Sequence, residues 1–539
     1  MPRQYWLFLG LFLCLRLIFW WVTFPNPDEA YYWLWGQHPA LSYYDHPALQ
    51  AWAEGLVTAL FGRSSLVLRL PNLVSNGLFF YTYYQICRYL YGRQARPYFW
   101  MVVLLVLASP LYFLFLALAW PDHLLITLSL LGSYLMIRFL DGYLVNGRGN
   151  SWRLYGAALA LGLAGLAKYN AAFVWLGLLA AIASHSKLRP LFRDYRLYLA
   201  GMIGLCCLLP IGLWNFSNNF QSWQYYANRS VDSGGGLYLK PWEPIGFLLI
   251  SALTLSPLIG VMIYRLLRHP RIVPNSIYPR VAIWLFAVST LSLTAIALIS
   301  TALYYWNITA YLLLFPLLPK YLSSHRPTLA ETASVPFTSR LFFSSQIYGL
   351  IFATLLVCHY SFVPISALFG PEGDPDSRML FGWQQVAAAV ETEAATLGNQ
   401  PFLATSDYRS ASALAYQLQN PAVMAISDRL DQFDIWYPSD RLFIGRNAIL
   451  LWDDWHPLKP EILQQFEATS KPNTVTVTRF GVLIKKYYLA RGYNFQGGRV
   501  SQATPSRLTL PTPDAIALPV EGNKSTGTGY PRPGWYSGR

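Results

Sequence analysis

The stretch 22-VTFPNPDEAYYWLWGQHPALSYYDHPALQAW-52 follows a run of almost purely hydrophobic residues. It places ionisable side chains, among them those of Asp28, Glu29, Asp45 and His46, among many tyrosines and tryptophans. The preceding run has the length of a membrane span, since about 20 helical residues cross the hydrocarbon core of a bilayer. The sequence therefore predicts a polar loop, over residues 24–65, directly after a membrane-spanning helix.

The composition extends this interpretation to most of the chain. Of the 539 residues, 54% are hydrophobic and 12% are charged, whereas a soluble domain usually carries about 25% charged residues. The apolar runs do not alternate in segments of about 10 residues, as those of a membrane β-barrel would, so the spans are predicted to be helices. We expect a polytopic α-helical membrane protein with about eleven transmembrane helices, at 5–23, 66–86, 98–117, 123–140, 154–167, 170–184, 198–216, 244–264, 281–301, 303–319 and 341–362. The short segments 154–167 and 170–184 are interpreted as either a tight hairpin or a partly re-entrant pair.

Lysine and arginine residues gather in alternate loops, after the second, fourth, sixth, eighth and tenth predicted spans. Cytoplasmic loops carry the excess of these residues. The loop 24–65 is therefore expected to face outward, together with Asp122, Lys168 and the region after the last span. This placement also explains the net charge of +14, so we predict no nucleic-acid partner.

The region after the last span changes in composition. Residues 363–492 are predicted to form a soluble α/β domain on the extracytoplasmic side, after a transmembrane domain over residues 1–362. Within it, 473-NTVTVTRF and 480-FGVLIKKYYL are typical of β-strands. Residues 493–539 are rich in Gly, Pro, Ser and Thr and are predicted to be a disordered tail.

The predicted outer face collects ionisable residues at the membrane boundary. Such residues are costly there and are candidates for function by default. They are Asp28, Glu29, Asp45, His46, Arg69, Asp122 and Lys168. Gathered on one face, they favour a site that handles an anion next to an acid or a base.

Each of these residues also has a purely structural interpretation. Pro27-Asp28-Glu29 is typical of a helix start, where an acid caps the first turn. Arg69 can extend to the membrane surface, His46 can be an ordinary loop residue, and Lys168 can anchor a helix end. The aromatic residues from Tyr31 to Trp35 are explained by an interfacial belt, or alternatively by stacking on a sugar ring.

Several motifs occur in a characteristic order. A hydrophobic helix is followed by P-x-P-D-E-A-Y-Y at 25–32 and by Y-Y-D-H-P-A-L-Q-A-W at 43–52. Next come 119-AWPDHLLITLSLLGSYLMIRFL, 161-LGLAGLAKYNAAF, 214-WNFSNNFQSWQY, 382-GWQQV, 405-TSDYRSASALAYQL and 431-DQFDIW. This order resembles the GT-C fold glycosyltransferases, over about residues 1–490. More narrowly, it resembles the bacterial dolichyl-phosphate-mannose-protein mannosyltransferase-like proteins, a branch that includes the lipid A aminoarabinose (ArnT-like) transferases.

The resemblance implies transfer of a sugar from a polyprenyl-phosphate donor to an acceptor hydroxyl, with inversion at the sugar carbon. Asp28 matches the catalytic aspartate of the family, and a carboxylate can serve as the base for a hydroxyl. The leaving lipid phosphate needs cations, for which Lys168 and Arg69 are the candidates, and Asp122 is expected to orient the lysine or bind substrate. The implied donor site also contains His46, Asp45 and Tyr169, with support from Glu29, Tyr31, Tyr44 and Asn215.

The resemblance also implies partners and a location. The partners are the lipid-linked sugar donor, a lipid, glycan or protein acceptor, and membrane lipids. The location is the bacterial inner membrane, with the active site and the C-terminal domain on the periplasmic side.

The chain departs from the aminoarabinose branch at one tripeptide. That branch has Glu-Lys-Pro where this chain has Asp45-His46-Pro47. The replacement removes a permanent cation, so the contribution of His46 to phosphate binding depends on pH, and the donor sugar stays open. The five cysteines show no metal-ligand spacing. We predict no metal site and no firm cofactor, although some GT-C enzymes use a divalent metal.

Two other functional classes remain alternatives. A transporter or flippase for a lipid-linked or anionic substrate often has repeated halves and broken helices in mid-membrane, whereas here the halves do not match and the charges gather at one face. A non-catalytic scaffold would not need Asp28, His46 and Lys168 on one face.

Overall fold

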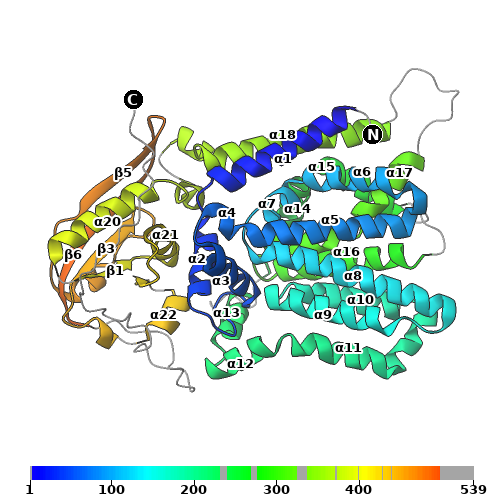
Figure 1. The fold of residues 1–539 in the computed structure, drawn as a ribbon, viewed down its shortest axis with the longest axis horizontal. Helices are drawn as coiled ribbons and strands as arrows, with labels where there is room; N and C mark the ends of the chain where they lie inside the picture. Colours follow the sequence, from blue (N-terminus) through cyan, green and yellow to red (C-terminus); the bar gives the residue numbers. More distant parts are fainter. Residues whose placement is uncertain are drawn as a thin grey trace, which may run out of the picture.

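The computed structural model describes residues 3–230, 239–268, 276–324, 337–370, 373–398, 400–427, 429–438 and 440–497. A body of packed helices joins a C-terminal domain built on a β-sheet, and a group of short helices lies between them (Figure 1). This arrangement agrees with the predicted membrane protein with a C-terminal α/β domain.

The helical body contains most of the predicted spans. Its helices are α1 (Arg3–Val22), α5 (Leu70–Tyr91), α6 (Ala95–Leu107), α7 (Pro110–Phe115), α8 (Pro121–Asn146), α9 (Ser151–Ala167), α10 (Ala171–Ala183), α11 (Tyr195–Cys206), α12 (Leu209–Ser217), α14 (Glu243–Leu255), α15 (Pro257–Arg268), α16 (Tyr278–Ala297), α17 (Leu318–Ser324) and α18 (Phe337–Ser361). Short 3₁₀ helices add η1 (Gly92–Gln94), η2 (Ser186–Arg193), η3 (Tyr304–Tyr311) and η4 (Phe315–Leu317).

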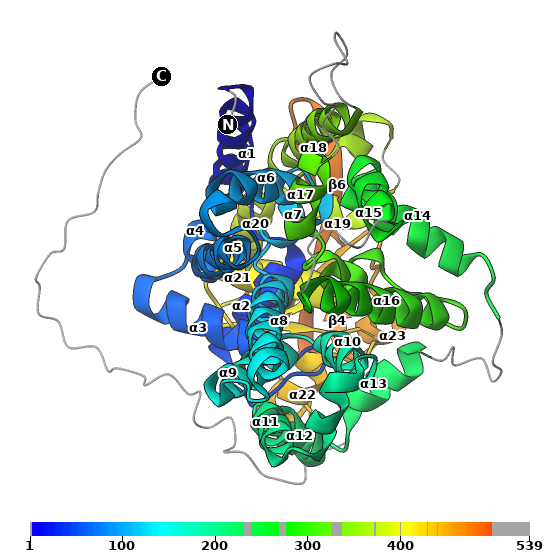
Figure 2. The same cartoon turned by 90° about the vertical axis from the view of Figure 1, so that its right-hand side faces the viewer.

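Within the described residues, four helices are long and apolar enough to cross a membrane, or up to seven if each bent pair is one span. The count of eleven spans therefore stays a prediction. Helix α8 lies at the centre of the body (Figure 2), with 72% of its apolar window buried, compared with 28% for α1 at the periphery. The ionisable residues at the start of α8 are consequently placed in the protein interior.

The chain departs from a simple series of spans in two places. The predicted span 303–319 is not one α-helix, because η3 and η4 fold much of it as 3₁₀ turns, which are buried from Asn307 onward. The segments 154–167 and 170–184 are α9 and α10, which pack mainly against α8 and α16, respectively. Helix α10 is bent by 115° from η2.

The predicted loop 24–65 is largely helical. It folds as α2 (Pro27–Gln37) and α3 (Leu49–Phe61), followed by α4 (Ser65–Leu68), and these lie between the helical body and the sheet domain (Figure 1). Asn26 caps α2, and Glu29 completes a capping box with it. The helix start at Pro27 is therefore confirmed, but the cap is Asn26, and Asp28 is not used for capping.

A pair of glycines sets how closely α2 and α3 approach. A Cβ atom added to Gly36 would lie 2.7 Å from the backbone nitrogen of Gly55. No larger side chain fits at this crossing, so the two helices form a tight layer under the C-terminal domain.

The C-terminal domain is a six-stranded mixed sheet, with its two longest helices on one face. Its strands are β1 (Phe402–Thr405), β2 (Val423–Ala425), β3 (Ala448–Asp453), β4 (Phe466–Thr469), β5 (Asn473–Arg479) and β6 (Val482–Phe495). Strand β1 pairs in parallel with β2 and β3, whereas β6 pairs antiparallel with β3, β4 and β5. The helical elements are η5 (Ile365–Leu368), α19 (Pro375–Arg378), α20 (Trp383–Leu397), α21 (Tyr408–Leu418), α22 (Gln432–Trp436), η6 (Asp440–Leu442) and α23 (Pro460–Leu463).

Helices α20 and α21 cover the face of the sheet that looks toward the body, and α21 packs on α2. Strand β6 extends to Phe495, so the first residues of the predicted tail 493–539 belong to the sheet. Residues 498–539 of that predicted tail lie outside the described residues.

The aromatic residues of α2 form the core between the two domains. Tyr31, Tyr32, Trp33 and Trp35 are each at most 5% exposed, and they belong to one cluster with residues of α20, α21 and α22. The interfacial-belt interpretation of Tyr31 to Trp35 is therefore wrong, because the C-terminal domain covers the outward face of α2. Trp21, which is 77% exposed, does remain at the surface of α1.

Candidate functional site

A cavity of about 110 Å³ lies where the helical body meets the C-terminal domain. Asp28, in the first turn of α2, lines it, together with Tyr304 and Tyr305 of η3. The C-terminal domain contributes Asp376 and Arg409 to the same cavity. A carboxylate, a cation and aromatic rings thus converge from three separate parts of the chain.

The environment of Asp28 favours the neutral form of its carboxyl group. Burial raises the pKa of Asp28, while the nearby Arg409 guanidinium lowers it and the Asp376 carboxylate raises it further. The Tyr408 hydroxyl donates a hydrogen bond to Asp28 Oδ1 at 3.4 Å, and Arg409 Nε donates to the same hydroxyl at 3.1 Å. A buried carboxyl with a raised pKa beside a cavity is a candidate for proton transfer.

Lys168 and Asp122, both predicted site residues, form an ion pair. Lys168 Nζ lies 2.8 and 2.7 Å from the two carboxylate oxygens of Asp122, and both side chains are buried. The ammonium also lies over the Tyr305 ring, 4.8 Å from its centroid. Because Tyr305 lines the Asp28 cavity, the ion pair lies next to that cavity.

Tyr32 lies near three of the predicted acids. It is a buried residue of α2, and burial is the main cause of its raised pKa. The Asp28, Asp122 and Asp45 carboxylates all raise this pKa further. Three acids that the sequence placed on one face are thus close to a single phenol.

Asp45 is held by the C-terminal domain. Its carboxylate accepts a hydrogen bond from Tyr31 Oη at 3.1 Å and forms an ion pair with Arg429. The Arg429 guanidinium in turn lies over the Tyr408 ring, 4.6 Å from the centroid, and over the Tyr225 ring at 5.7 Å. Arg429 therefore connects Asp45 to the tyrosine that contacts Asp28.

His46 contacts α13 (Gln221–Ser230). Its Nδ1 lies 3.1 Å from the hydroxyl of Tyr226, which also donates to the backbone carbonyl of Asp45. Tyr226 packs edge-on against Tyr169, with 4.9 Å between ring centroids. The Asp45-His46 dipeptide is thus placed beside the predicted donor-site residue Tyr169.

Arg69 and Glu29 form a separate structural unit. Arg69 Nε and Nη2 donate to the two oxygens of Glu29 at 3.1 and 2.8 Å, and both side chains have no exposed surface. Arg69 Nη1 donates to the carbonyls of Phe19, Trp20 and Thr23. All of its nitrogens are engaged, which favours a structural role for Arg69, and its binding of the donor phosphate stays a prediction.

The other predicted supporting residues also organise the site. The Tyr44 ring packs on Tyr225, 5.0 Å between centroids, and its backbone N–H donates to Gln432 Oε1. Asn215 Oδ1 accepts from the backbone N–H of Trp223 at 3.3 Å, which fixes the turn between α12 and α13. Asn215 therefore holds the start of α13 in place, and it does not line the Asp28 cavity.

Sequence reasoning missed the arginines and the tyrosine that the C-terminal domain supplies. Tyr408 and Arg409 start α21, and Arg429 lies before α22. The segment 405-TSDYRSASALAYQL was recognised as part of the resemblance, and Asp407 is the N-cap of α21. A helix cap followed by Tyr and Arg was the available signal, but nothing local in the sequence aims these side chains at a residue 380 positions away.

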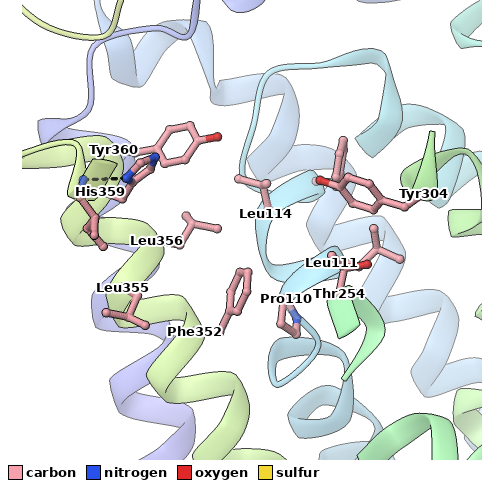
Figure 3. Close-up of a pocket in the computed structure, with 12 residues that line it drawn as sticks. Pro110, Leu111, Leu114, Thr254, Tyr304, Phe352, Leu355, Leu356, His359 and Tyr360 are labelled. Carbon is pink, nitrogen blue, oxygen red and sulfur yellow. Dashed lines mark hydrogen bonds between the residues drawn. The ribbon is translucent and has the colours of Figure 1, made fainter. Parts of the chain in front are cut away.

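A second cavity, of about 290 Å³, is drawn in Figure 3. Its walls are mainly apolar and come from α7 and α18, with Leu111, Phe352 and Leu356 among them. Leu114, Phe115, Tyr304 and Tyr360 line both cavities. An apolar chamber therefore adjoins the polar chamber that Asp28 lines.

Among the described residues, one group of three side chains has ligand atoms close enough to hold a metal ion, namely Asp407, Asp453 and His456. It belongs to the C-terminal domain and does not include Asp28, Asp122 or Asp45. The prediction that the catalytic site itself uses no metal stays a prediction.

Comparisons with known proteins agree with this architecture. The family model described as dolichyl-phosphate-mannose-protein mannosyltransferase matches residues 45–214. The structure of ArnT from Cupriavidus metallidurans in the apo state is 14% identical, with a TM-score of 0.62, over 93% of this chain and 98% of that chain. The structure of the same protein bound to undecaprenyl phosphate is 15% identical, with a TM-score of 0.61, over 90% and 98% of the two chains.

No curated protein matches the chain in sequence. At identities of 14–15%, the likeness to ArnT establishes the fold. The comparisons therefore confirm the predicted resemblance: the chain has the GT-C fold and is similar to the polyprenyl-phosphate-sugar glycosyltransferases that share it.

Proposed function

We propose that this protein is a membrane glycosyltransferase that moves a sugar from a polyprenyl-phosphate donor to an acceptor hydroxyl on the outer side of the membrane. The observation that carries this proposal is the convergence of Asp28 and the Lys168–Asp122 pair on the Tyr305 ring. A base and a cation beside one cavity suit a reaction that removes a proton and releases a phosphate. The undecaprenyl phosphate bound to the similar ArnT structure is consistent with this donor class.

The reaction is written as a direct displacement with inversion. The acceptor oxygen attacks the anomeric carbon as the bond from that carbon to the phosphate oxygen breaks. Asp28 accepts the proton of the acceptor hydroxyl, and the bonding electron pair leaves with the polyprenyl phosphate. Lys168, oriented by Asp122, stabilises the negative charge that develops on the departing phosphate.

The aromatic residues have a matching role. Tyr304, Tyr305 and Trp120 line the Asp28 cavity, and flat aromatic faces suit the apolar face of a sugar ring. The adjoining apolar chamber is suited to the hydrocarbon chain of a lipid-linked substrate. The protein is proposed to act in the bacterial inner membrane, with this site on the periplasmic side.

A comparison of cell-envelope glycans and glycolipids by mass spectrometry tests the proposed function. A deletion strain is expected to lack one sugar substituent, which returns with the wild-type gene and does not return with an Asp28→Asn gene. A normal envelope in the deletion strain would contradict the proposal. Movement of the lipid-linked substrate across vesicle membranes without an acceptor, equal in wild type and Asp28→Asn, would instead favour the transporter alternative.

Replacement of Lys168 by Gln is expected to weaken use of the donor. A hydrogen bond to a charged group contributes about 1.5–3 kcal/mol, so kcat/KM for the donor should fall roughly ten- to a hundredfold. Lys168→Arg keeps the charge and should retain more activity than Lys168→Gln. Steady-state kinetics with varied donor measure the effect, with Lys187→Gln on the opposite side as the matched control. Unchanged donor kinetics in folded Lys168→Gln would remove Lys168 from the site.

Replacing either of two charged neighbours of Asp28 is expected to shift the acid limb of the pH profile of kcat/KM, and the two shifts should have opposite directions. The base must be ionised, so activity is lost as the pH falls through the raised pKa of Asp28. Arg409 lowers this pKa and Asp376 raises it. The acid limb of kcat/KM should therefore move to higher pH in Arg409→Gln and to lower pH in Asp376→Asn. Shifts of both variants in the same direction would show that another group controls the limb.

A further inference from the structure

A cluster of three potential ligands lies beside the start of α21, in the C-terminal domain. Asp407 is in the connection from β1 to α21, Asp453 is the last residue of β3, and His456 follows in the next turn. One ligand atom of each residue lies within 4.8 Å of the other two. Imidazole and carboxylate groups in this combination are typical zinc ligands.

The spacing is close to that needed around an ion. His456 Nδ1 lies 3.2 Å from Asp453 Oδ1 and 3.9 Å from Asp407 Oδ2. Zinc bonds of about 2.0–2.2 Å in a tetrahedral site put neighbouring ligand atoms roughly 3.3–3.6 Å apart. Small side-chain movements would therefore bring the three atoms to coordination distance.

Asp407 provides a second observation that points to a cation. It is 5% exposed, and its Oδ1 is used to cap α21, accepting from the backbone N–H groups of Arg409 and Ser410. Its Oδ2 faces His456 and has no hydrogen-bond partner among the described residues. Buried polar atoms are nearly always paired. A buried carboxylate oxygen without a hydrogen-bond partner is therefore suited to bind a cation.

Tyr487 adds a second unpaired group to the same place. It is completely buried, lies opposite Asp453 in the register of β3 and β6, and has a hydroxyl without a partner among the described residues. The Asp453 and Asp407 carboxylates both raise its pKa, after burial, so the phenol lies near both acids.

Lys485 is the competing cation and must be accounted for. Its Nζ lies 2.6 Å from Asp453 Oδ2, and both side chains are almost fully buried. This contact uses the oxygen that does not face His456. Lys485 alone does not balance two buried carboxylates, and the other positive charge near them is that of His456 when protonated, which faces both acids. Carboxylates that bind metals are commonly held by a partner on their other oxygen. Lys485 is therefore placed to support Asp453 as a ligand.

We propose that Asp407, Asp453 and His456 form a binding site for a divalent transition metal, with Zn²⁺ as the favoured ion. The site has a structural consequence, because Asp407 directly precedes Tyr408 and Arg409, which reach the Asp28 cavity. A bound ion fixes the N-terminus of α21 and so holds these two side chains in place. The proposal concerns the C-terminal domain and does not depend on the identity of the transferred sugar.

Titration of the chelator-treated full-length protein with Zn²⁺ tests this site. Calorimetry and elemental analysis should give one equivalent of tightly bound zinc, and zinc should raise the melting temperature. His456→Gln and Asp407→Asn should both lose that equivalent and the thermal shift. Asp454→Asn is the matched control, because Asp454 lies next to the cluster but accepts from Tyr488 instead, and it should bind zinc normally.

Two results would overturn the proposal. One is the absence of zinc binding by the wild-type protein, and the other is an unchanged equivalent in His456→Gln. If a variant does not fold, Co²⁺ added to the chelator-treated wild-type protein tests metal binding without any substitution. A tetrahedral cobalt absorption spectrum that zinc displaces supports the site, and its absence refutes it.

Discussion

Replacement of Asp28 by Asn is expected to abolish sugar transfer while the protein still folds. An amide cannot accept the acceptor proton, and a positioned general base typically contributes about 10²–10⁴-fold to the rate. The fold should tolerate the change, because the cap of α2 is Asn26 and the buried ion pair of that turn belongs to Glu29. An amide oxygen can also keep the hydrogen bond from Tyr408. The measurement is kcat for transfer to saturating acceptor by purified protein.

The kinetic pattern separates a base from a residue that only binds substrate. Loss of the base should lower kcat and kcat/KM together, whereas loss of a binding contact raises KM with kcat unchanged. Glu391→Gln is the matched control, because Glu391 is an exposed acid on α20, and this variant should behave as wild type. Near-normal kcat in a folded Asp28→Asn protein would refute the assignment of Asp28.

Local sequence patterns predicted the positions of the acids but could not rank them. Asp28 and Glu29 are neighbours, and successive residues on a helix point about 100° apart. One therefore faces the cavity and the other faces Arg69. Which of them does so depends on Arg69, 40 residues later, and on α21, 380 residues later. The residues around Asp28 and Glu29 in the sequence include neither Arg69 nor α21.

The same distance effect explains why the individual residues that the C-terminal domain supplies, Tyr408, Arg409 and Arg429, were missed. Lys168 and Asp122 were predictable, because charged residues at the ends of apolar helices are conspicuous. Arg409 and Arg429 lie in a region of soluble composition, where an arginine is unremarkable. Their importance arises only because α21 packs on α2, which brings Arg429 to Asp45 across 384 positions.

The aromatic residues of α2 show how a correct general rule failed. Tyrosines and tryptophans next to a membrane span usually mark the interface with water. Here the C-terminal domain packs over them, so Tyr31 stacks on Phe433 with 6.0 Å between ring centroids. Burial between domains and burial at a lipid interface favour the same residue types, and composition alone does not separate them.

Breaking the Glu29–Arg69 pair is expected to cost more stability than any other change considered. Removal of one partner from a buried ion pair leaves an uncompensated charge and typically costs about 3–5 kcal/mol. The loss should extend beyond the pair, because Glu29 Oε1 also accepts from the backbone N–H of Ala119, close to Asp122, and Arg69 binds three carbonyls at the end of α1 and just beyond it. Glu29→Gln and Arg69→Met should therefore both lower the melting temperature strongly.

A double-mutant cycle distinguishes this structural role from a direct role in donor binding. If the pair is structural, Glu29→Met combined with Arg69→Met should be less destabilised than the sum of the single variants, because no charge is left unpaired. Thermal unfolding of the purified proteins measures the cycle, and donor KM is measured on the folded fraction of each. If Arg69 contacts the phosphate, donor KM should rise by a similar factor in Arg69→Met and in the double variant, and not in Glu29→Gln. If the pair is structural, donor KM should stay close to wild type in whatever fraction remains folded, since every nitrogen of Arg69 is already engaged away from the cavity.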